Sequence, residues 1–95
     1  HVSMATFAAR RLGDMATNSS GILAVELLAA CQGVDFRAPL KSSARLEEAK
    51  ALLREVVPFY DQDRYFAPDI ARADELVRAG AFNRFMPDGL LPSAE

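Results

Sequence analysis

The hydrophobic positions of the chain recur at helical intervals, and no stretch shows the strict alternation of a strand. In the first third they form one continuous face. The pattern predicts a single long helix over about 3–33, which begins after a cap at Ser3 and ends near Gly33. The residues of this face are Met4, Ala8, Leu12, Met15, Ile22, Leu23 and Leu27.

One segment of this helix, Thr17–Gly21, consists of residues with weak helix propensity. The hydrophobic face nevertheless continues beyond it without a change of phase, from Met15 to Ile22. We therefore expect one unbroken helix. The small side chains within the segment should let a crossing helix approach closely.

The second half of the predicted helix, Gly21–Gly33, is apolar around nearly its whole circumference, with Glu26 and Gln32 as its polar residues. Such a helix is either buried on all sides or placed in a membrane. It is much shorter than the roughly 20 residues that span a bilayer. We therefore expect other helices to enclose it. Because a chain of 95 residues can hardly supply them all, the chain is predicted to be part of a larger helical bundle.

A second helix is predicted over about 44–57. Ser42–Ser43 offers its N-terminal cap, and Pro58 disfavours helical backbone at the residue before it. The preceding connector, 34–41, should be held by hydrophobic anchors. The expected buried stripe of the helix is Leu46, Ala49, Leu53 and Val56, and the expected anchors are Phe36 and Leu40.

A third helix is predicted over about 68–79, with a proline in its first turn and Gly80 just past its end. The chain is thus expected to be all-α. The buried stripe should be Ile70, Ala73, Leu76 and Val77. In the tail we expect a helical turn at Phe82, Phe85 and Met86, a chain reversal at Pro87–Gly89, and a final anchor at Leu90, Leu91 and Pro92.

Composition limits the possible functions. A net charge of −2 gives no electrostatic reason to expect nucleic acid or a membrane as partner. The one cysteine, Cys31, cannot form an internal disulfide and is expected to be a small core residue. The chain shows no signal-peptide pattern, and these features fit a cytoplasmic protein.

Candidate chemistry is sparse. His1 is the only histidine, so a zinc site is not expected. Asp61–Asp63 lacks the glycine and the distal glutamate of a calcium loop, and Arg64 offers a local charge partner instead. The glycines do not have the spacing of a phosphate-binding loop.

Two groups of residues allow more than one interpretation. Glu26, in apolar surroundings, either pairs with an arginine on a neighbouring helix or faces a subunit boundary, which we favour, or is tuned for acid–base chemistry. Tyr60, Arg64 and Tyr65 could line a cleft. The favoured alternative is that the aromatic residues Phe59 and Phe66 pin this linker to the core.

Three stretches together resemble the C-terminal portion of the histidine ammonia-lyases, which are members of the aromatic amino acid lyase family. The resemblance covers essentially the whole chain, 1–95. The stretches are His1–Met4 with Ala8–Leu12, Gly21–Glu26 with Ala29–Arg37, and Asp63–Ile70.

The resemblance implies a portion of a mostly helical homotetramer that converts L-histidine to trans-urocanate and ammonia. The family's methylidene-imidazolone prosthetic group forms from an Ala-Ser-Gly triplet, which is absent here; we reject Ser19–Gly21 as its precursor. His1 matches the last residue of the family's Gln-Glu-Asp-His context, so its active-site glutamate would precede this chain. We therefore expect no catalytic, cofactor-binding or metal residue, and no activity from the chain alone. Its expected partners are the remainder of the subunit and identical subunits.

Two other hypotheses remain open. The chain could be a free-standing helical module that self-associates through its apolar helix. It could also belong to a tyrosine or phenylalanine ammonia-lyase or aminomutase. His1–Met4 favours the histidine enzyme, although the residues that decide substrate choice are not in this chain.

Overall fold

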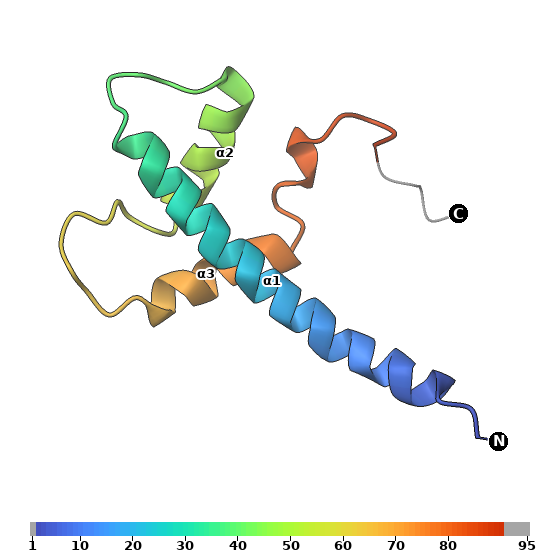
Figure 1. Ribbon diagram of the computed structural model, residues 1–95. Coiled ribbons are helices and arrows are strands. Elements are labelled where there is room, and N and C mark those ends of the chain that lie inside the picture. The colour runs from blue at the N-terminus through green and yellow to red at the C-terminus, as the bar shows by residue number, and fades with distance from the viewer. Residues whose placement is uncertain (1, 91–95) are drawn as a thin grey trace.

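The chain folds as one long helix against which two shorter helices pack. The computed structural model describes residues 2–90. Within that range there is no strand, so the predicted all-α class is confirmed. Figure 1 shows α3 crossing the middle of α1 and α2 lying near the C-terminal end of α1. The elements are α1 (Ala5–Asp35), α2 (Ala44–Arg54), α3 (Ala67–Arg78) and the short 3-10 helix η1 (Asn83–Phe85).

Helix α1 is continuous through its weakly helical segment, as the phase of its hydrophobic face predicts. The hydroxyl of Thr17 donates to the carbonyl of Gly13 at 3.1 Å, so this polar side chain is satisfied within the helix. The hydroxyl of Ser3 accepts from the Ala5 N–H at 3.3 Å, although the capping position itself is Met4. The helix ends at Asp35, two residues beyond the predicted end near Gly33.

Helix α2 begins as predicted, with the Ser43 hydroxyl accepting from the Leu46 N–H at 3.4 Å. It ends at Arg54, earlier than the expected residue 57. The expected stripe is partly wrong. Leu53 is buried, but Leu46 and Val56 are exposed and Val57 is buried instead. The final turn thus departs from regular helix and directs Val57 into the core.

The hydrophobic anchors expected in the connector before α2 are also not buried. Phe36 and Leu40 are both largely exposed. Phe36 makes an edge-to-face contact with Phe59, with ring centroids 5.7 Å apart. This aromatic pair joins the two connectors at the surface instead of anchoring either one in the core.

Helix α3 agrees with the sequence pattern, and the tail agrees with it in part. Gly80 adopts a φ of +68°, which ends the helix in the left-handed conformation that glycine tolerates. Ala73 is fully buried, and Ile70 and Leu76 pack against the core. The expected helical turn is η1, and the Leu90 N–H donates to the Pro87 carbonyl at 3.3 Å in the predicted reversal. The expected final anchor is wrong at Leu90, which is largely exposed, and its other residues, Leu91 and Pro92, lie outside the described residues, as does His1.

The core is small and lies where α1 meets α3 and the end of α2. Its buried residues are Ala24, Leu28, Cys31, Leu53, Val57 and Ala73. Ala24 on α1 and Ala73 on α3 are completely buried, and their methyl side chains allow the two backbones to come close. Close to this crossing, Ser20 donates a hydrogen bond to Asp74 of α3. The small segment of α1 therefore lies close to a crossing helix, as expected.

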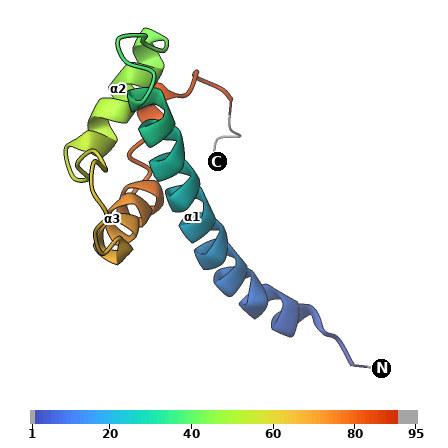
Figure 2. The same ribbon diagram turned by 60° about the vertical axis from the view of Figure 1, so that its left-hand side comes forward.

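Most of the surface of α1 is not covered by this chain. Its buried residues are Ala24, Leu28 and Cys31, whereas Ile22 is 68% exposed and Met15 is 53% exposed. Figure 2 shows α2 and α3 on the same side of α1, and its N-terminal part extending beyond both. The prediction that this chain does not enclose the helix is confirmed. None of the helices in the described part of the chain is long and apolar enough to cross a membrane.

Candidate functional site

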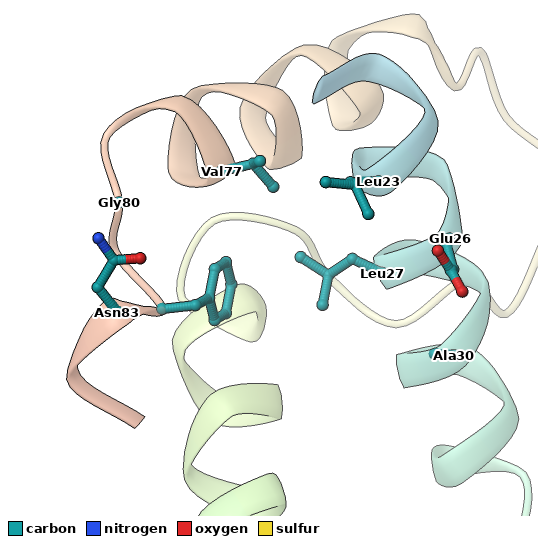
Figure 3. A pocket seen from close by; sticks show the side chains of 8 residues that line it. Leu23, Glu26, Leu27, Ala30, Val77, Gly80 and Asn83 are labelled. Atoms are coloured by element: carbon teal, nitrogen blue, oxygen red, sulfur yellow. The ribbon is translucent and has the colours of Figure 1, made fainter. Parts of the chain in front are cut away.

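An open apolar groove lies between α1, the end of α3 and the segment that follows it. Its volume is about 440 Å³. Figure 3 shows Leu23 and Leu27 on the α1 side of the groove and Val77 on the opposite side. The groove therefore suits an apolar side chain, and few of its lining side chains could act as an acid, a base or a nucleophile. Its lining residues are Leu23, Glu26, Leu27, Ala30, Val77, Gly80, Phe82 and Asn83.

Glu26 is the only ionisable residue in the lining of this groove. Its side chain is exposed in this chain, and among residues 2–90 it forms no ion pair. The expected arginine partner of Glu26 is thus not found among these residues, and its position at a subunit boundary remains a prediction. No other ionisable group is among the described residues that line the groove, so an acid–base pair is not formed between those residues.

A cluster of charged side chains fastens α2 to the C-terminal end of α1. Asp35 accepts from Lys50 Nζ at 2.8 Å and from Arg54 Nη2 at 2.7 Å. Partial burial opposes ionisation of Asp35, but the hydrogen bonds from Lys50 and Arg54 outweigh it and lower its pKa below the usual range. Lys50 also pairs with Glu47 at 3.0 Å, and its two carboxylate partners raise its pKa. The cluster is a structural clamp, because every charge in it is neutralised by another.

Gln32 extends this clamp to the loop after α2. Its Nε2 donates to the Tyr60 carbonyl at 2.8 Å, and its Oε1 accepts from the Tyr60 N–H at 3.1 Å. Both polar groups of one backbone unit are thereby satisfied by one amide side chain. Gln32, one of the two polar residues in the apolar half of α1, therefore holds the loop in place.

Arg64 organises the rest of that loop. Its Nε donates to the buried carboxylate of Asp69 at 2.9 Å, and its other nitrogens donate to the carbonyls of Phe59 and Pro58 at 3.2 and 3.1 Å. The guanidinium also lies 5.0 Å from the centroid of the Tyr60 ring. Each of its three nitrogens thus donates a hydrogen bond within the chain. These bonds support the interpretation that the aromatic loop is held against the rest of the chain. The cleft alternative is also borne out in part, because Tyr60 and Arg64 line a pocket of about 410 Å³ between this loop and α1, whereas Tyr65 is not among its lining residues.

The remaining predictions for this loop are partly corrected. The charge partner of Arg64 is Asp69 and not the neighbouring acidic pair, of which Asp63 accepts from the Tyr60 hydroxyl. This hydrogen bond raises the pKa of Tyr60. Tyr65 is 82% exposed. Phe66 packs against the core, as expected of an anchor. Phe59, the other expected anchor, is exposed, so that part of the prediction is wrong.

Ser19–Gly21 lies in the middle of α1, with the Ser20 hydroxyl bonded to Asp74. A helix commits each backbone N–H and C=O to partners four residues away. The ends of the triplet therefore cannot meet to form a ring, and these residues do not fit a prosthetic-group precursor. Cys31 is buried as predicted, and burial raises the pKa of its thiol. Throughout residues 2–90, no three His, Cys, Asp or Glu side chains gather as a metal site would require.

Sequence reasoning missed the clamp around Asp35 and the burial of Asp69. A local signal existed for part of the clamp, because Glu47 and Lys50 have the three-residue spacing of a helical ion pair. No local signal joins Asp35 to Arg54, which lie 19 residues apart. Their contact depends on the return of the chain along α1.

Comparison with known proteins shows similarity along nearly the whole chain. A histidine ammonia-lyase from Aliivibrio fischeri is 72% identical over 93 residues, and one from Vibrio cholerae is 71% identical over the same length. Each alignment covers 98% of this chain and 18% of the relative, so the chain spans less than a fifth of the length of these relatives.

A solved structure and a family model agree with these relatives. The crystal structure of histidine ammonia-lyase from Trypanosoma cruzi matches with a TM-score of 0.85 and 37% identity, over 93% of this chain and 18% of that one. The family model for aromatic amino acid lyases matches residues 1–55, which is more than half of the chain. By sequence and by fold, the chain belongs to the aromatic amino acid lyase family.

Proposed function

We propose that this chain is the C-terminal scaffold and oligomer-contact portion of a histidine ammonia-lyase, an enzyme that converts L-histidine to trans-urocanate and ammonia. The observation that supports it most strongly is the high identity to histidine ammonia-lyases over 98% of the chain. A cytoplasmic location belongs to the same proposal. Cys31 is buried and unpaired, which fits a reducing compartment.

The scaffold role is supported by how much apolar surface the chain leaves uncovered. Large side chains such as Leu12, Met15 and Ile22 are exposed along α1. Apolar surface of this extent costs free energy in water, and burial against another protein surface removes that cost. The remainder of the lyase subunit and identical subunits are the partners that we propose for it.

The absence of activity in the isolated chain is supported by its chemistry. The groove presents one carboxylate without a base or nucleophile beside it. The clamp and the aromatic loop use their charged groups to hold the fold together. The methylidene-imidazolone and the residues around it would come from the rest of the enzyme.

A chimeric enzyme tests this proposal. The segment of Vibrio cholerae histidine ammonia-lyase that aligns with this chain is replaced by the chain, and urocanate formation from L-histidine is followed by absorbance. We expect activity and oligomeric state comparable to those of the parent. The chain alone should produce no urocanate. A chimera that assembles but is inactive, or an isolated chain that turns over histidine, would overturn the proposal.

A further inference from the structure

We draw no further inference here: the strongest candidate, the pocket between α1 and the loop after α2 that Gln32, Arg54 and Arg64 help to line, carries none, because these side chains already bond within the chain and nothing in the structure shows what covers the pocket in a chain that spans 18% of its relatives.

Discussion

Arg54 on α2 donates from Nε and Nη2 to a single oxygen of Asp35 on α1, at 2.9 and 2.7 Å. Its remaining nitrogen, Nη1, donates to the carbonyl of Val57 at 3.2 Å. One guanidinium thus closes the turn after α2 and joins that turn to the end of the long helix. Because Val57 is buried, the position of part of the core depends on this ion pair.

Replacing Arg54 should destabilise the chain more than replacing an exposed arginine. Arg54→Ala removes several charge-assisted hydrogen bonds, so we expect a loss of about 1–3 kcal/mol in the free energy of unfolding. Urea denaturation followed by circular dichroism measures it. Arg78→Ala is the matched control. It breaks a half-exposed pair within α3 and should cost about 0.5 kcal/mol or less. Equal losses in the two variants would show that the clamp stabilises the fold no more than a half-exposed ion pair does.

The clamp should also make stability depend on pH in acid. The pKa of Asp35 is lowered in the folded state, so its contribution is complete above its unfolded pKa of about 3.9 and is lost as the pH falls through the folded value. The difference in stability between wild type and Asp35→Asn should therefore be constant near neutral pH and shrink below about pH 4. Urea midpoints measured over a pH series test this. A difference that persists unchanged into strong acid would exclude the ionised Asp35 as its source.

Truncation of Leu53 should be among the most costly changes in the core. Leu53→Ala leaves a cavity at a fully buried position, and such changes cost about 2–5 kcal/mol. Leu46→Ala, in the same helix, removes the same atoms from a position that is 61% exposed and should cost less than about 1 kcal/mol. Thermal melting of both variants compares them. Similar melting points would show that Leu46 and Leu53 are buried to the same extent, as the sequence pattern predicts and the structure does not.

Two glycine substitutions should act in opposite directions. Gly80→Ala forces an alanine into positive φ and brings its Cβ within 2.8 Å of the Asn83 side chain, so we expect a loss of about 1–2 kcal/mol. Gly21→Ala adds a methyl group inside α1 with no atom within 4 Å and should gain about 0.5–1 kcal/mol from helix propensity. Chemical denaturation of the purified chain measures both. A stabilised Gly80→Ala variant would contradict the left-handed end of α3.

Local rules predicted the elements of this fold well. The phase of the hydrophobic face carried α1 through Thr17–Gly21, and Ser43 and Gly80 marked helix ends through capping and backbone conformation that depend on neighbouring residues alone. The C-terminal ends of α1 and α2 differ from the predicted ends. A contact between residues far apart in the sequence acts at both ends, because Asp35 at the end of α1 holds Arg54 at the end of α2, 19 residues later.

The sequence by itself determined the helices, the burial of Cys31, and the apolar excess of α1 over what the chain can cover. These follow from spacing and composition, which are local. Only the tertiary structure decided which side of α1 meets α3, that Asp35 clamps α2, and that Arg64 pairs with Asp69 and not with its neighbours. The first two depend on how the chain returns along α1, and the third depends on how the loop before α3 folds back on that helix. A helical stripe states which residues can be buried together, but not which partner covers them.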